Sequence, residues 1–151
     1  MEENNGKFQF QKILDLKEQH ERFLKLEVAR LQRALAELQE AGEHCARLRE
    51  DALGKLRTAR QKAETELNDQ YSVYFEHLRA ELRRHCEEAD KVEAQKKETR
   101  DRLERVMQSR KLLEQYRDRL AQQFQRKVEK AEERVLDGYS IQKFVNHEAL
   151  L

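Results

Sequence analysis

Residues 24–38, with the sequence LKLEVARLQRALAEL, carry the pattern from which the fold of this chain can be predicted. Their apolar members Leu24, Val28, Leu31, Leu35 and Leu38 follow one another at steps of four, three, four and three. This alternation places them on one stripe of a helix and is typical of the seam of a coiled coil. The stretch therefore predicts a helix that packs along its length against another helix.

Similar stripes extend on both sides of this stretch and predict two helical arms. The first arm is predicted over residues 8–67, where the stripe outside residues 24–38 consists of Phe8, Phe10, Ile13, Leu14, Leu16, Phe23, Gly42, Cys45, Leu48, Ala52, Leu56, Ala59, Ala63 and Leu67. The second arm is predicted over residues 73–137, with a stripe of Tyr74, Leu78, Leu82, Ala89, Val92, Leu103, Val106, Leu113, Tyr116, Leu120, Phe124, Val128, Ala131 and Val135.

Residues 68–72, with the sequence NDQYS, are the weakest helical stretch near the middle. Asn, Asp and Ser favour caps and turns because their side chains compete for backbone partners. We therefore predict an all-α fold, a long two-helix antiparallel coiled-coil hairpin with its turn at about residues 68–72. Asp137 and Gly138 form a candidate helix stop before a tail at residues 138–151. The alternative is one unbroken helix that pairs in parallel with a second chain.

Composition supports a single elongated unit over residues 1–151. The chain contains no proline and four glycines, and 40% of its residues are charged. Proline breaks helices, so its absence favours continuous helix. An apolar fraction of 38% suffices for a narrow seam and falls below the roughly 45–50% of an average domain with a thick core.

Charge and hydropathy narrow the classes of partner and the location. The 31 basic residues nearly balance the 30 acidic ones, whereas nucleic-acid binders usually carry a basic excess. We therefore expect no nucleic-acid partner. No stretch approaches the roughly 18 consecutive apolar residues of a membrane span, and residues 1–7 are polar, so we expect a cytoplasmic protein. The two cysteines fit a reducing compartment.

Catalytic and cofactor-binding patterns are missing from the sequence. The glycines stand apart, and no nucleophile, base and oxyanion donor can be grouped on one face, so we expect neither an enzyme nor a cofactor. The pairs His44-Cys45 and His85-Cys86 would oppose each other if the turn lay near residue 65. A turn near residue 69 instead puts Cys45 beside about residues 93–95. We therefore expect no metal site.

The opening KFQFQKILDLKE, residues 7–18, resembles the start of the FliJ family of bacterial flagellar export proteins, which typically begin with two phenylalanines one residue apart. The segments RKLLEQYR, residues 110–117, and EKAEERVLD, residues 129–137, are similar to the family as well. The resemblance covers most of the chain and departs from the family at Gly138 and Tyr139.

The resemblance implies a central stalk of the flagellar type III export apparatus, similar to the stalk of rotary ATPases. Its partners would be a hexameric export ATPase, the cytoplasmic domain of the export gate, and export chaperones. The protein would then lie peripherally at the inner face of the cell membrane. By this resemblance, Phe8, Phe10, Ile13, Leu120, Phe124 and Val128 would form the paired-end seam.

The same resemblance assigns the contact residues. At the end in the ATPase pore, Phe8 and Phe10 would accompany the basic residues Lys127, Lys130 and Arg134. The gate would be met by Tyr74, Leu78 and His85. Two alternatives stay open: the equivalent stalk of a virulence-type injection system, and a structural coiled-coil scaffold dimer.

Overall fold

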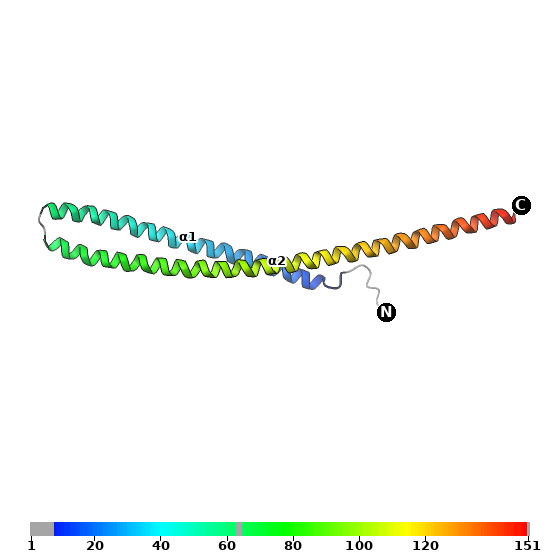
Figure 1. Cartoon of the computed structure of the whole chain (residues 1–151), viewed down its shortest axis with the longest axis horizontal. Helices are drawn as coiled ribbons and strands as arrows, with labels where there is room; N and C mark the ends of the chain where they lie inside the picture. The colour runs from blue at the N-terminus through cyan, green and yellow to red at the C-terminus, as the bar shows by residue number, and fades with distance from the viewer. Residues whose placement is uncertain (1–7, 63–64, 151) are drawn as a thin grey trace. The chain divides into compact units, whose positions relative to one another are not determined.

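The computed structural model describes residues 8–62 and 65–150 and consists, over these residues, of two helices without any strand (Figure 1). Helix α1 spans Gln11–Gln61 and helix α2 spans Thr65–Ala149. The prediction of an all-α helical hairpin is confirmed. The predicted polar lead at residues 1–7, the seam residue Ala63 and the last tail residue Leu151 lie outside the described residues.

Packing groups the residues of the chain into two units. The hairpin unit is Glu21–Arg105, and the terminal unit combines Met1–His20 with Val106–Leu151. Within the hairpin unit, α1 and α2 run side by side in opposite directions, in cyan and green in Figure 1.

The core of the hairpin unit is the predicted seam of α1. Its buried apolar residues are Leu24, Leu31, Leu35, Cys45, Ala52, Leu56 and Ala59, with Leu78 from α2. Small side chains dominate the second half of this seam and let the helix backbones approach. A Cβ added to Gly42 would lie 3.9 Å from Cδ1 of Leu82 on the facing helix.

The seam of α2 in this unit is more polar than its predicted stripe. After Leu78, the sheltered positions include His85, Ala89, Val92, Lys96 and Thr99. Lys96 is only 7% exposed. A lysine tolerates such a position because its aliphatic stem covers apolar surface while its ammonium group reaches water. The apolar pattern missed Lys96, since a charged residue is read as an exposed one.

The connection between the helices lies between Gln61 and Thr65, which corrects the predicted turn at residues 68–72. Residues 68–72 belong to the first two turns of α2. Their polar side chains serve the helix there: the Ser72 hydroxyl donates to the Asn68 carbonyl at 3.0 Å, and Arg60 Nε donates to Asn68 Oδ1 at 3.3 Å. Residues that favour turns also favour helix beginnings, so composition alone misplaced the turn.

In the terminal unit, residues 8–20 lie beside the first part of the α2 stretch from Val106, and the rest of that stretch is exposed. Leu14 is fully buried, whereas Ile13 and Leu16 of the predicted stripe are exposed. From Asp118 to Leu150 every residue is exposed except the half-buried Val128. We call residues 118–150 the C-terminal stretch.

The predicted helix stop at Asp137 and Gly138 is wrong, because α2 continues through both to Ala149. A Cβ at Gly138 would meet nothing within 4 Å, so no close packing requires glycine there. A single glycine costs a helix only about 1 kcal/mol relative to alanine, which a long helix tolerates. Most of the predicted tail is therefore helical.

Candidate functional site

Three residues were predicted to meet the gate, and the structure gives them different surroundings within the hairpin unit. Tyr74 is half-buried and lines a groove between the helices, together with Leu48, Asp51, Ala52, Lys55, Leu67, Gln70 and Tyr71. Leu78 is 5% exposed and belongs to the core. His85 is half-buried beside Glu81, with Nε2 3.7 Å from Glu81 Oε2. Leu78 also lines a second groove, with Ser72, Phe75 and Leu82, but it is the more deeply buried of the two groove residues.

The aromatic residues at the start of α2 line grooves between the helices, whereas their apolar neighbour Val73 faces solvent. The rings of Tyr71 and Phe75 lie 6.3 Å apart, and both are half-buried. Val73 is exposed at 69% of its surface. Val73 was not among the predicted contact residues. It comes directly before Tyr74 and therefore lies on another face of the helix.

At the terminal unit, Phe8 and Phe10 form an aromatic cluster with Tyr116. The ring centroids of Phe8 and Phe10 lie 5.8 Å apart, and each lies close to Tyr116, at 6.0 and 6.2 Å. These tilted and edge-on arrangements are favourable for aromatic rings and fasten the start of α1 to α2. All three residues belong to the predicted stripes, but the sequence did not predict that their rings contact one another.

The predicted seam of Phe8, Phe10 and Ile13 with Leu120, Phe124 and Val128 is corrected. Leu120, Phe124 and Ile13 are exposed. The reason is the position of the turn: in an antiparallel pair, moving the turn by one residue moves the facing partner by two. Because the helices are connected earlier in the sequence than predicted, Phe8 and Phe10 face Tyr116 rather than Phe124.

The basic residues Lys127, Lys130 and Arg134 are exposed on the C-terminal stretch. Their spacing of three and four residues puts them on one face of α2. Val128, Ala131 and Val135 follow each of them by one residue and line a shallow hollow with Glu132 and Leu136. An apolar row thus runs beside a basic row.

Further exposed apolar residues of the C-terminal stretch lie outside the predicted stripes, and the sequence did not predict the conformation of the tail. They are Leu136, Tyr139, Ile141, Phe144, Val145 and Leu150. Exposed apolar side chains gathered in this way commonly mark an interface with a partner. The signal was available in the sequence, because residues 139–145 combine four large apolar residues with one lysine.

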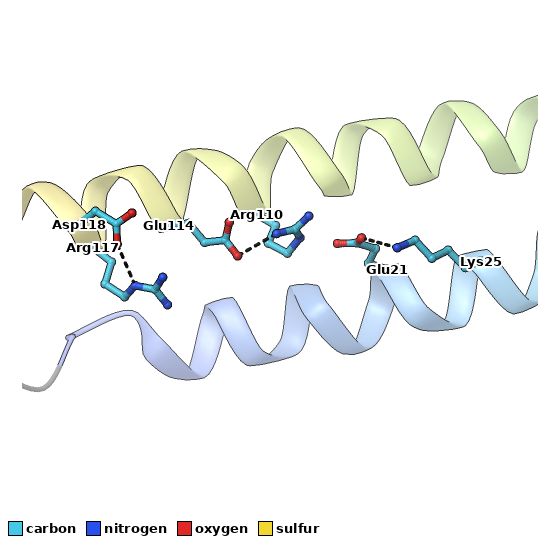
Figure 2. Close-up of polar contacts among 6 residues, drawn as sticks. All are labelled: Glu21, Lys25, Arg110, Glu114, Arg117 and Asp118. Carbon is cyan, nitrogen blue, oxygen red and sulfur yellow. Dashed lines mark hydrogen bonds and ion pairs between the residues drawn. The ribbon is translucent and has the colours of Figure 1, made fainter.

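Ion pairs border the seams of both units, and Figure 2 draws three of them. In the hairpin unit, Lys25 Nζ lies 2.8 Å from Glu21 Oε1. In the terminal unit, Arg110 lies 2.8 Å from Glu114, and Arg117 Nε lies 3.4 Å from Asp118. The Arg110 and Glu114 side chains are half-buried, so solvent screens this pair less than the exposed ones.

One exposed pair changes the acidity of a carboxyl group. A side-chain hydrogen bond from Arg30, with Nε 3.1 Å from Glu27 Oε2, lowers the pKa of Glu27 below its ordinary value. The hydrogen bond favours the charged carboxylate. Because the pair is exposed, its contribution to the stability of the helix is small.

The fold and these surfaces define a class, a coiled-coil hairpin protein that displays apolar and basic side chains on a helix. The family model described as flagellar FliJ protein matches residues 6–149. The chain therefore belongs to the FliJ family. Comparison with curated proteins and with solved structures gives no significant match. Among the described residues, neither helix has a stretch apolar enough to span a membrane.

Proposed function

We propose that this chain is a non-enzymatic stalk of the flagellar type III export apparatus, linking the hexameric export ATPase to the cytoplasmic domain of the export gate. Membership of the FliJ family supports a role in flagellar export. The observation that carries the proposal is the C-terminal stretch, a helix that displays apolar residues such as Phe124, Val135 and Phe144.

The C-terminal stretch has the chemistry of an insertion segment. Its helical part, residues 118–149, reaches about 48 Å at the rise of an α-helix. Exposed apolar side chains are costly in water and are covered when a partner surrounds the helix. Lys127, Lys130 and Arg134 would face acidic groups of the ATPase pore, while Phe8 and Phe10 fasten α1 to α2 through Tyr116.

Contact with the gate is proposed at Tyr74, Leu78 and His85. Tyr74 borders an open groove, whereas Leu78 supports the helix pair from within the core. Tyr74→Ala is therefore the informative variant, because Leu78→Ala would also weaken the hairpin unit. The gate domain should bind Tyr74→Ala at least tenfold more weakly, by the usual size of aromatic anchors.

The test for the ATPase contact is co-purification of the full chain with the export ATPase of the same organism. Val135→Asp should abolish the complex, because it puts a charge into the apolar row of Val128, Ala131 and Val135, which the ATPase would cover. Leu26→Asp is the matched control, since Leu26 is 73% exposed in the hairpin unit. Equal retention of the ATPase by Val135→Asp and Leu26→Asp would contradict the proposal.

The basic row is tested by charge reversal. The triple variant Lys127→Glu, Lys130→Glu and Arg134→Glu should weaken ATPase binding and its dependence on salt. The matched control reverses the exposed residues Arg83, Lys91 and Lys97 of the hairpin unit. If both triples bind the ATPase equally, the basic row has no role in that contact.

Two further parts of the proposal concern other partners and location. Escort of export chaperones would follow from the family, as would a cytoplasmic position, peripheral at the inner face of the cell membrane. The flagellar family match favours the flagellar system over an injection system. A structural scaffold dimer would instead remain dimeric at every dilution in light scattering.

A further inference from the structure

Three metal-ligating side chains meet inside the hairpin unit. Cys45 extends from α1, and Glu81 and His85 extend from α2 four residues apart. One ligand atom of each, the thiol sulfur, a carboxylate oxygen and an imidazole nitrogen, lies within 4.8 Å of both others. We call these residues the Cys45 cluster.

The position of the turn creates this cluster. Cys45 lies 16 residues before Gln61 at the end of α1, and Glu81 lies 16 residues after Thr65 at the start of α2. The two residues therefore face each other in the antiparallel pair. A turn near residue 69 would set Cys45 against about residues 93–95. The prediction of no metal site rested on that register and on the roughly 100° between adjacent side chains of a helix.

The cluster is sheltered and leaves one polar atom without a partner. Cys45 is 8% exposed, and the His85 side chain is 16% exposed. Among the described residues, His85 Nδ1 is the buried side-chain nitrogen or oxygen that has no hydrogen-bond partner. Buried polar atoms are nearly always satisfied, so the imidazole of His85 has hydrogen-bonding capacity that the described residues do not use.

An ordinary core contact explains the cluster less completely. Cys45 would then be a small apolar side chain of the seam, and His85 would pair with Glu81, 3.7 Å away. That explanation accounts for the burial of Cys45. It gives no reason why a sulfur, a nitrogen and an oxygen ligand from two helices converge.

We propose that Cys45, Glu81 and His85 form a zinc site. Thiolate, imidazole and carboxylate are the ligands that Zn²⁺ uses in proteins, and three of them leave the fourth tetrahedral position to water. Metal–ligand bonds of about 2.0–2.3 Å bring neighbouring ligand atoms to roughly 3.3–3.7 Å of one another. Small side-chain rotations would close the observed separations of up to 4.8 Å.

Binding links α1 to α2 without any redox step. The Cys45 thiol loses its proton to solvent, the sulfur–zinc bond forms, and bound water leaves the ion. Because the ion binds ligands that converge in the folded hairpin, it stabilises the hairpin unit, and this stabilisation grows with the logarithm of the free zinc concentration above the dissociation constant. The bound ion would thus cross-link the two helices.

The test is titration of the purified full chain with Co²⁺, followed by displacement with Zn²⁺. A thiolate-to-cobalt charge-transfer band and the visible bands of tetrahedral cobalt should appear with one ion per chain and disappear when Zn²⁺ is added. Zn²⁺ should also raise the melting temperature. Absence of the thiolate band at saturating Co²⁺ would overturn the proposal.

The chain offers matched controls for each ligand. Cys86 follows His85 and is exposed, and His44 precedes Cys45 and is exposed. Cys45→Ser and His85→Gln should weaken Zn²⁺ binding at least about 100-fold, because loss of even an outer-shell partner costs about 10–100-fold. Cys86→Ser and His44→Gln should bind as the unchanged chain does. A Cys86→Ser variant that loses the cobalt band would overturn the assignment.

Glu81→Gln keeps the proposal testable if the Cys45 variant does not fold. Glu81 is half-buried at the edge of the seam, so the amide should be tolerated while one metal ligand is removed. Circular dichroism checks that its helicity is unchanged. Unchanged Zn²⁺ affinity in Glu81→Gln would exclude this residue as a ligand and overturn the site as proposed.

Discussion

Two stretches of α2 with similar amphipathic patterns differ in where their large apolar side chains lie. In the hairpin unit, Leu78 is buried and Tyr74 is half-buried. In the C-terminal stretch, Phe124, Val135 and Phe144 are exposed at 57–63% of their surface. The first stretch has α1 as its partner, and the second has no partner among the described residues. An apolar stripe therefore predicts a contact face without saying which molecule supplies the other half.

The largest effect should come from a charge in the seam of the hairpin unit. Leu31→Asp buries a carboxylate at a position that is 5% exposed and should destabilise the protein by about 4 kcal/mol or more. Thermal melting followed by circular dichroism measures the loss. Leu26→Asp, at a position that is 73% exposed, should change the melting temperature little. Equal losses in the two variants would break the distinction between seam and surface.

A smaller effect should come from the aromatic cluster of the terminal unit. Tyr116→Ala removes the ring that meets both Phe8 and Phe10 and should cost about 1–3 kcal/mol locally. Hydrogen exchange of residues 11–20 should accelerate as the start of α1 loosens. Tyr139→Ala is the control, because Tyr139 is exposed on the same helix. Unchanged exchange in Tyr116→Ala would show that the cluster does not hold α1.

Replacing glycine with alanine compares the packed helix of the hairpin unit with the exposed helix of the C-terminal stretch. Gly42→Ala and Gly138→Ala should each stabilise their helix by about 0.5–1 kcal/mol through helix propensity. The new methyl group at residue 42 meets Leu82 at an ordinary contact distance of 3.9 Å, whereas at residue 138 it meets nothing within 4 Å. Gly42→Ala should therefore raise the melting temperature of the hairpin unit, and Gly138→Ala the helicity of the C-terminal stretch. A destabilised Gly42→Ala would mean that the helices approach more closely there.

The smallest effect should come from the exposed pair of Glu27 and Arg30. The pKa of Glu27 is lowered in the folded protein, so the pair stabilises α1 above the ordinary carboxyl pKa. This stabilisation is lost as the pH falls through the lowered pKa. Glu27→Gln should therefore melt slightly earlier than the unchanged chain at neutral pH and low salt, and equally in acid. A difference that persists in acid would assign the effect to something other than charge.

The two helices and the apolar stripe along which they pack could be predicted, whereas the alignment of α1 with α2 could not. Leu24, Leu31 and Leu35 lie in the core because their spacing leaves no other face for them. Asn68 and Ser72 misled the placement of the turn, since such residues serve turns and helix beginnings alike. The candidate contact residues on the C-terminal stretch were predicted in part, and the tail residues Tyr139 and Phe144 were missed.

The helices and the apolar seam of α1 follow from local sequence, because residue spacing and the absence of proline act along the backbone itself. Which residues face each other follows only from how the two helices pack. A shift of the turn by a few residues moves every facing pair by twice as many, and no local preference reports that shift. The meeting of Cys45 with Glu81 and His85, and of Phe8 and Phe10 with Tyr116, follows from that one position.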